Sequence, residues 1–387
     1  MSTLRLADVV VRHGPAYVER FGATMPASHR AALHAIAACR TPMLGGHIAQ
    51  CDHCGREHLL FHSCRHRACP RCGYDATTHW LERQRELLLP VPYFHVVFTL
   101  PQELRRLVRE HQRLLLGALF LAAFESLAKL CADDRYLGTP RIGALAVAHT
   151  WARTLEWHPH IHMLVPGGGI ARDDRTWLQP PRRPRLYLVP VKALSKIFRA
   201  CFLARVQRAL PDITLPQELW TRPWVVFAKP VVHGADKLLE YLGRYVHRTA
   251  LSDKAIADVD ADSVTFTYRR SRDHQCRAMR LPPHEFLRRF LQHVPPKGVH
   301  RVRTYGLLHP SHRDRLRRLQ LLLSPRTMPP PTLAPSPPAP KRLCCHCHHG
   351  SLHLVRRLTF ADCFILLAAI AALARLFPAP SPKGASP

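Results

Sequence analysis

Two histidines separated by a single residue, His160 and His162, are the side chains that best suit chemistry on a phosphodiester. They lie in residues 160–165, where β-branched and apolar side chains predict a strand. A strand directs alternate side chains to one face, so the two imidazoles lie about 6.6 Å apart and can hold one divalent ion. Such an ion, bound to a phosphodiester oxygen, polarises the phosphorus and stabilises the charge that develops during attack.

The histidine pair leaves two points open. The chain has 27 histidines, and pairs of histidines on strands also occur as ordinary surface residues. His149 and His158 are both candidates for a third metal ligand, and the sequence does not choose between them.

Two tyrosines four residues apart, Tyr241 and Tyr245, are candidate nucleophiles. The apolar spacing from Asp236 to Ala250 predicts a helix, which places both phenols on one side. A phenol has a pKa of about 10 and is a poor nucleophile near neutral pH, but a metal ion or guanidinium favours the phenolate. Arg244 and Arg248 are placed to do this, or to hold the flanking phosphates. The alternative is that the tyrosines are two half-buried core aromatics.

Two Cys-x-x-Cys pairs near the N-terminus predict a structural zinc site. Cys51 and Cys54 are separated from Cys69 and Cys72 by 14 residues, which is close to the spacing of four-cysteine zinc sites. Four side chains inside the loop are possible replacements for one ligand: His58, His62, Cys64 and His66. The alternative is a set of buried cysteines without metal.

Basic side chains lie among these cysteines, and a third cysteine pair lies far along the chain. Arg65, Arg67 and Arg71 would give the zinc module a surface that can face phosphates. Cys344 and Cys347 supply one clear pair, so a second, C-terminal zinc knuckle stays an open alternative.

The composition points to a nucleic-acid partner inside the cell. The 387 residues carry 56 Lys and Arg against 27 Asp and Glu, a formal charge of +29 spread along the chain. The apolar run from Phe364 to Phe377 is too short for a membrane span and is broken by Arg375. No secretory run follows the N-terminus, so we expect a cytoplasmic protein that meets the DNA of a bacterial nucleoid. In that reducing setting the 13 cysteines favour metal ligation and core packing over disulfides.

The elements that must position these side chains indicate an α+β fold. Strands are predicted at Tyr93 to Leu100, Gly143 to Trp151 and His160 to Val165, and a long helix from about Gln102 to Ala132. Because no regular strand–helix repeat is present, an antiparallel sheet flanked by helices is favoured. Ser324 to Lys341 holds eight prolines and predicts a stiff linker. We therefore expect a zinc module over 1–90, a nuclease domain over 91–320, and a linker with a degenerate Cys/His tail over 321–387.

Further sequence motifs accompany these residues in a fixed order along the chain. They are the cysteine-rich stretch 51–72, WLER at 80–83, PYFHVVFTLP at 92–101, HPHIH at 158–162, GGG at 167–169, YLGRY at 241–245 and YGLL at 305–308. Over roughly residues 15 to 320 this combination resembles the IS91 family, which are rolling-circle insertion-sequence transposases of the two-tyrosine HUH class.

The resemblance implies a zinc-binding N-terminal domain ahead of an HUH endonuclease domain with a central antiparallel sheet. It implies cleavage of one DNA strand through a 5′-phosphotyrosine and a free 3′-hydroxyl, with magnesium or manganese and without a nucleoside triphosphate. By position, His160 and His162 are the metal ligands, and Tyr241 and Tyr245 are the nucleophiles. The implied partners are single-stranded transposon ends and target DNA, with no membrane.

The chain departs from the family pattern in two places. The family commonly continues the tyrosine helix with a segment like Ala-Ile-Ser-Asn-x-Arg, whereas this chain has ALSDKA at 250–255. Its C-terminal Cys-Pro-x-Cys element is altered, and the apolar end from Phe360 to Phe377 has no counterpart in the pattern.

Two other functions fit part of the sequence. A plasmid relaxase or rolling-circle replication initiator shares the nicking chemistry, although the chain has no Gly-x-x-x-x-Gly-Lys-Ser/Thr loop of a fused helicase. A non-catalytic, zinc-dependent DNA-binding protein explains the charge and the cysteines, but it leaves the histidine and tyrosine pairs without a role.

Overall fold

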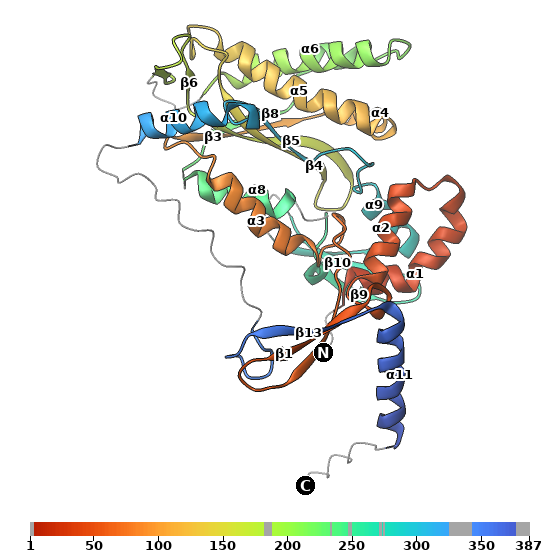
Figure 1. Cartoon of the computed structure of the whole chain (residues 1–387). Helices are drawn as coiled ribbons and strands as arrows, with labels where there is room; N and C mark the ends of the chain where they lie inside the picture. The colour runs from red at the N-terminus through yellow and green to blue at the C-terminus, as the bar shows by residue number, and fades with distance from the viewer. Residues whose placement is uncertain are drawn as a thin grey trace.

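A five-stranded antiparallel sheet forms the centre of the molecule. The computed structural model describes residues 4–181, 188–232, 234–246, 250–270, 273, 275–324 and 343–376. The strand order is β12-β4-β5-β3-β8, and each neighbouring pair runs antiparallel (Figure 1). The strands are β3 (Tyr93–Thr99), β4 (Gly143–Trp151), β5 (Trp157–Pro166), β8 (Val226–Pro230) and β12 (Val302–Gly306). The predicted α+β class with a central antiparallel sheet is therefore confirmed.

One face of the sheet packs on two long helices and one short one. These are α4 (Arg105–Glu110), α5 (Gln112–Cys131) and α6 (Val191–Ala209), which lie above the sheet in Figure 1. Phe98, Ile161 and Met163 point into the core on this side, together with Phe198 and Phe202 of α6. Because side chains alternate along β5, the histidines between these apolar residues point to the opposite face.

Helix α5 is long and apolar enough to cross a membrane by length and composition. In this fold it lies on the sheet and against α6, with eleven of its residues buried. A core helix of a globular domain passes the same test, so its hydropathy is explained by packing.

In the described part of the chain, three helices lie on the opposite face of the sheet. They are α3 (Gly73–Arg85), α8 (Ala235–Val246) and α10 (Arg313–Leu323). Val147 and Leu164 of the sheet share a core with Leu239 and Leu242 of α8. Gly243 lets α3 approach α8 closely, because a Cβ atom there would lie 2.8 Å from a methyl group of Leu81.

The N-terminal helices share a core with a distant part of the chain. Helices α1 (Leu6–Phe21) and α2 (Ala27–Ala38) pack against α9 (Pro283–Leu291) and a three-stranded sheet. That sheet has the order β11-β10-β9, formed by β9 (Ile256–Val259), β10 (Val264–Arg269) and β11 (Cys276–Leu281). The buried residues of α1 and α2 thus do not form a core of their own.

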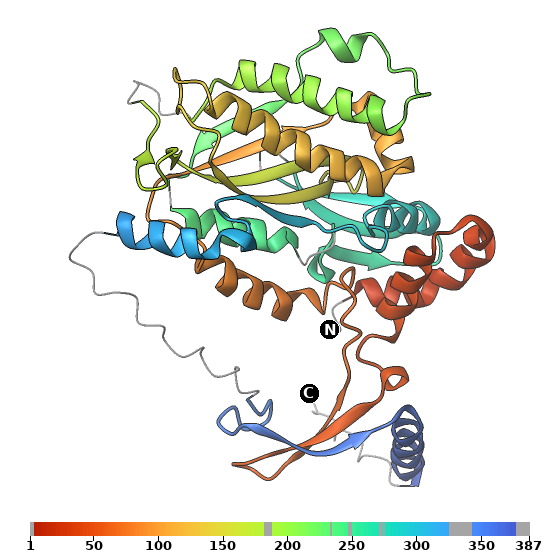
Figure 2. The same ribbon diagram turned by 45° about the horizontal axis from the view of Figure 1, so that its top comes forward.

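A second small sheet combines both ends of the chain. It has the order β13-β1-β2, from β1 (Gly46–Cys51), β2 (Glu57–Phe61) and β13 (Leu352–Leu358). Figures 1 and 2 show it extending from the body of the molecule, with α11 (Phe360–Leu376) at its end. Short elements elsewhere include the strands β6 (Gly169–Ile170) and β7 (Trp177–Leu178) and the helix α7 (Glu218–Thr221).

The expected elements near the histidines agree well with the structure. The strand predicted from Gly143 to Trp151 has these bounds, and the strand predicted at His160 begins three residues earlier, at Trp157. The predicted helix from Gln102 to Ala132 is interrupted at His111, between α4 and α5. The proline-rich segment lies outside the described residues from position 325 onward.

Candidate active site

Four histidines from three adjacent strands gather on the sheet face that carries α8. His160 and His162 come from β5, His149 from β4 and His95 from β3. The register pairs His149 directly with His160, and the ring nitrogens of His149, His160 and His162 lie within 4.8 Å of one another. This cluster is the strongest candidate for a divalent metal site among the described residues outside the cysteines.

Hydrogen bonds fix which nitrogen of two histidines faces the cluster. Nδ1 of His160 lies 2.7 Å from the carbonyl oxygen of His158 and must donate to it, which leaves the Nε2 lone pair available. Nδ1 of His162 lies 2.8 Å from Nε2 of His95. Nε2 of His162 is buried and has no hydrogen-bond partner in the described part of the chain. Metal-binding histidines are typically oriented in this way, by a bond to the second ring nitrogen.

Burial keeps these imidazoles neutral. It lowers the pKa of His160 and of His95 to about 4. Burial, together with repulsion from the neighbouring histidines, lowers the pKa of His149 and of His162 well below 6.5. Because only neutral imidazole binds a metal ion, the side chains present fit a divalent cation near neutral pH.

Of the two candidates for a third ligand, only His149 lies in the cluster. His149 joins the cluster because β4 pairs with β5 and brings it opposite His160. His158 is oriented differently, with its Nδ1 2.6 Å from the Arg105 guanidinium. The sequence did not identify His95 as a member of this group. Its position on a predicted strand was a signal, but only the pairing of β3 with β5 places it beside His162.

Tyr241 lies beside the histidines. Its ring centroid is 6.1 Å from that of His162 and 6.3 Å from that of His95. The side chain is 37% exposed, whereas Leu242 on the neighbouring position of α8 is fully buried. Tyr241 is therefore not a core aromatic, and its phenol can meet a strand that enters from solvent.

The other residues predicted around the tyrosines cannot be placed in the same way. Tyr245 and Arg244 belong to α8, but their side chains lie outside the described part of the structure. Arg248 lies outside it altogether. The role of Tyr245 as second nucleophile, and that of Arg244 and Arg248 as phosphate contacts, stay predictions.

The cysteines form two groups rather than the one expected. Cys69 and Cys72 meet Cys39 and Cys64, whereas Cys51 and Cys54 meet two C-terminal cysteines, Cys344 and Cys347. The expectation that the two N-terminal pairs share one tetrahedron is wrong. The physical reason is that Cys51 and Cys54 lie at the tip of the β1–β2 hairpin, whereas Cys69 and Cys72 lie at the start of α3.

The first group has the geometry of a four-cysteine zinc site. Sγ of Cys72 lies 3.5 Å from Sγ of Cys39 and 3.6 Å from Sγ of Cys64. Thiolates bound tetrahedrally to zinc at about 2.3 Å are about 3.8 Å apart, so small shifts suffice. Cys39 was missed because it stands alone in the sequence, in the helix-end segment that follows α2.

The arginines near this group have different surroundings. Arg67 donates to the carbonyl oxygens of Val299, Pro295 and Pro296 at 2.6–2.9 Å, so it joins the zinc module to the nuclease region. Arg71 donates to the Cys39 carbonyl at 3.4 Å.

Arg65 is exposed, as Arg67 is, but it is placed differently. It lines a groove of about 820 Å³ beside the β13-β1-β2 sheet, together with Arg40 and Arg357. Of the three arginines, Arg65 therefore best suits contact with a phosphate backbone.

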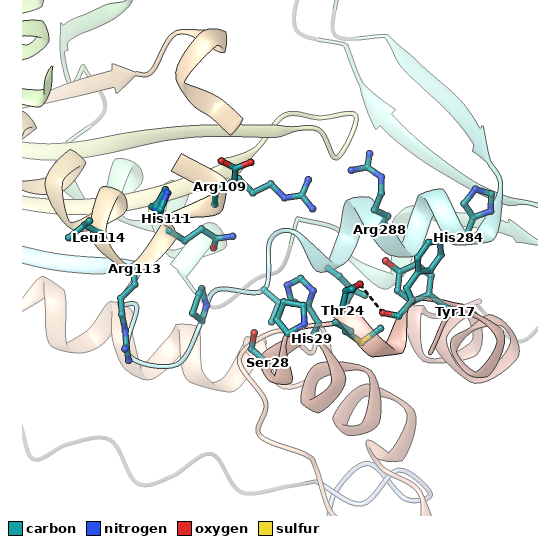
Figure 3. Close-up of a pocket in the computed structure, with 18 residues that line it drawn as sticks. Tyr17, Thr24, Ser28, His29, Arg109, His111, Arg113, Leu114, His284 and Arg288 are labelled. Atoms are coloured by element: carbon teal, nitrogen blue, oxygen red, sulfur yellow. Dashed lines mark hydrogen bonds between the residues drawn. The ribbon is translucent and has the colours of Figure 1, made fainter. Parts of the chain in front are cut away.

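A second cavity, of about 580 Å³, lies between the N-terminal helices and the nuclease region. Figure 3 shows Arg109, Arg113 and Arg288 around it, with Tyr17 and His29 on the side of α1 and α2. None of the clustered histidines lines this cavity. It is a positively charged recess separate from the candidate metal site.

Comparisons with known proteins match the regions that contain the histidine cluster and the N-terminal cysteines. The family model described as "Putative transposase" matches residues 143–315, which include the histidine cluster on β4 and β5 and helix α8. A model described as "Transposase zinc-binding domain" matches residues 9–100. The chain is 38% identical over 379 residues to "Putative transposase y4qJ" of Sinorhizobium fredii, covering 90% of this chain and 94% of that protein. The chain belongs to the IS91 family of transposases.

A second relative supports the same membership. The "Transposase for insertion sequence element IS801" of Pseudomonas savastanoi pv. phaseolicola is 30% identical over 296 residues, covering 70% of this chain and 68% of that protein. No solved structure matches the chain. As an IS91-family transposase, the protein is an enzyme that cleaves and transfers DNA strands, and its N-terminal module has a four-cysteine cluster for structural zinc.

Loss of this zinc should affect more than the N-terminal module. Cys39 and Cys69 belong to the core that α1 and α2 share with α9. We expect Cys69→Ser to remove zinc and to unfold this shared core together with the module, because structural zinc contributes folding free energy directly. Thermal unfolding and zinc content would be measured beside Cys131→Ser, which alters a buried cysteine outside the cluster. A normal zinc content in Cys69→Ser would contradict the assignment.

Proposed function

We propose that this transposase nicks and rejoins single-stranded DNA at the ends of an insertion sequence, by rolling-circle transposition through 5′-phosphotyrosine intermediates. The observation that carries the proposal is the position of Tyr241, whose ring centroid lies 6.1 Å from that of His162, one of the clustered imidazoles. A nucleophile beside a metal-binding cluster is the arrangement that phosphodiester cleavage needs.

The residues of the chain divide the chemistry between them. His149, His160 and His162 would hold one divalent ion, magnesium or manganese, which when bound polarises the phosphate and stabilises its developing charge. Oη of Tyr241 attacks phosphorus and loses its proton, and the bond from phosphorus to the 3′-oxygen breaks. The leaving oxygen takes up a proton and becomes a free 3′-hydroxyl, while the 5′-phosphate stays on the tyrosine.

A second tyrosine allows the strand to be exchanged as well as cut. Tyr245 lies one helical turn from Tyr241 on α8 and would attack a second phosphodiester while the first ester persists. A free 3′-hydroxyl then displaces a tyrosine and restores the phosphodiester. Because each ester retains the free energy of the broken bond, the proposal requires no nucleoside triphosphate.

Basic side chains supply the affinity for DNA. Arg65, Arg40 and Arg357 line the groove beside the small sheet, and the net charge of +29 attracts a polyanion over a wider area. We expect Arg244 and Arg248 to hold the phosphates that flank the cleaved bond. This protein would meet such DNA in the bacterial cytoplasm.

The test is the formation of a covalent protein–DNA adduct. Purified protein would be incubated with single-stranded and duplex oligonucleotides from the DNA that flanks its gene, with manganese or magnesium. The proposal predicts an adduct on single strands, released by a 3′-hydroxyl strand, and a labelled peptide that contains Tyr241 or Tyr245. An adduct that maps to neither tyrosine, or none at all with binding intact, would overturn it.

The same experiment separates the other candidates. A non-catalytic zinc protein gives no adduct. A replication initiator or relaxase also gives one, but on a plasmid origin rather than on transposon ends. The identity of the cleaved flanking sequence therefore decides between these two substrates.

His95 should act as a positioning residue for His162. We expect His95→Ala to weaken metal activation about 10–100-fold, because it removes the hydrogen-bond partner of His162 Nδ1. The readout is the manganese concentration that gives half-maximal cleavage. His95→Gln, which keeps a hydrogen-bonding side chain, should recover part of the loss. An unchanged manganese requirement in His95→Ala would show that this hydrogen bond does not orient the ligand.

A further inference from the structure

Four cysteines from opposite ends of the chain meet at the tip of the β1–β2 hairpin. Cys51 and Cys54 come from the hairpin, and Cys344 and Cys347 from the segment before β13. Their four Sγ atoms lie within 4.8 Å of one another. Cys51 and Cys347 are 3.7 Å apart, and Cys54 and Cys344 are 3.8 Å apart. These separations match thiolates around one zinc ion, about 3.8 Å, and not a disulfide of about 2.05 Å.

The two cysteine pairs are built alike. In each, the residue after the second cysteine has a left-handed backbone: φ is +68° at Gly55 and +60° at His348. In each, that residue's N–H donates at 3.0 Å to the carbonyl oxygen of the first cysteine, Cys51 or Cys344. Two similar turns that face each other are how four-cysteine sites are assembled from Cys-x-x-Cys motifs.

Backbone N–H groups also point at the sulfurs. His53 N–H lies 3.4 Å from Sγ of Cys51, and His346 N–H lies 3.4 Å from Sγ of Cys344. Gly350 N–H lies 3.4 Å from Sγ of Cys347. Such donors stabilise thiolate, the form that binds metal. A Cβ atom at position 350 would collide with Sγ of Cys51, so only glycine permits this closeness.

We propose that Cys51, Cys54, Cys344 and Cys347 bind a second structural zinc ion, which fastens the C-terminal segment to the N-terminal module. The two regions that match family models end at residues 100 and 315, so neither contains Cys344 or Cys347. The expected degenerate tail is thus half of a metal site. The proposal is independent of the cleavage chemistry.

Contacts around the cluster show that the two ends are matched beyond the cysteines. Asp52 accepts a hydrogen bond from Ser351 N–H at 2.7 Å, and Nε2 of His353 lies 3.1 Å from its second oxygen. From there β13 pairs with the whole length of β1, from Cys51 opposite Leu352 to Gly46 opposite Leu358. The zinc ion would therefore lie at the start of a continuous strand pairing.

The site also completes the basic groove. Arg357 and Leu354 come from β13, whereas Arg40, His62 and Arg65 come from the N-terminal side. Without the zinc ion, β13 would be held by its pairing with β1 and by contacts such as those of Asp52, with no metal link at its start. Its fixed position is what brings Arg357 to the same groove as Arg65.

Zinc stoichiometry of the full-length protein tests the proposal. Native mass spectrometry and elemental analysis should find two zinc ions per chain. Cys344→Ser with Cys347→Ser should leave one, at the cluster of Cys39. Cys345→Ser, in the same segment but outside the group, is the matched control and should keep two. One zinc ion in the wild type, or two in the double variant, would overturn the proposal.

A second measurement guards against general misfolding. In the double variant, hydrogen exchange should rise over residues 343–358 and 46–51, while the central sheet stays protected. Cys347→His should restore the second zinc ion and the protection, because histidine is also a zinc ligand. Loss of protection in the central sheet with no restoration by histidine would mean that these cysteines act in general folding, and it would refute a dedicated metal site.

Discussion

His160→Ala and His162→Ala are each expected to reduce DNA strand cleavage by at least about 10³-fold. A metal ion contributes several kcal/mol of transition-state stabilisation, and each 1.4 kcal/mol is a factor of about 10 in rate. Binding of DNA should change little, because affinity comes mainly from arginine and lysine contacts with phosphates. The measurement is cleavage of a labelled single strand under single-turnover conditions, beside the dissociation constant at one fixed salt concentration.

Two controls accompany the histidine variants. His158→Ala changes a histidine of the same strand whose Nδ1 lies beside the Arg105 guanidinium and whose ring nitrogens are outside the cluster, although its ring packs against that of His160. It should therefore keep most of the activity. EDTA should mimic the loss in the wild type, and added manganese or magnesium should restore cleavage. Cleavage that persists in EDTA and in the double alanine variant would rule out this site.

The tyrosine variants should separate cleavage from exchange. Tyr241→Phe and Tyr245→Phe should each retain some single cleavage and lose complete strand exchange. The double phenylalanine variant should form no adduct, because phenylalanine keeps the ring and removes the nucleophilic oxygen. Adducts would be counted on denaturing gels and mapped by mass spectrometry. Tyr305→Phe, which removes a hydroxyl beneath α5, is the matched control and should behave like the wild type. Wild-type exchange in both single variants would return the tyrosines to a packing role.

The sequence was most informative where spacing alone determines geometry. His160 and His162 share a face because a strand alternates, and Tyr241 leaves the apolar face of α8 because a helix repeats every 3.6 residues. Both depend on contacts within one element. The bounds of β4 and the sheet class followed from the same local patterns.

Long-range pairing explains what the sequence did not show. His149 and His95 approach the site only through the order of β4, β5 and β3, which spacing along the chain does not specify. Cys39 is a single cysteine without a motif, and it joins the first cluster because the end of α2 lies near the start of α3. The regular spacing of Cys51 to Cys72 was misleading, since it matched a common motif while the actual partners lie elsewhere.

The strand pairing between β1 and β13 has a consequence for synthesis of the protein. Cys54 and Cys344 are separated by 290 residues, which the ribosome adds in roughly 15–60 s at about 5–20 residues per second. Each doubling of the chain length between the two cysteine pairs adds only about 0.6 kcal/mol to the entropic cost of closing the loop. The time needed to synthesise this length of chain therefore matters more than the length itself. During that interval β1 has one unpaired edge, the kind of edge that promotes aggregation. A gene copy that stops before codon 344 would leave this edge open permanently, so completion of the small sheet distinguishes finished chains from truncated ones.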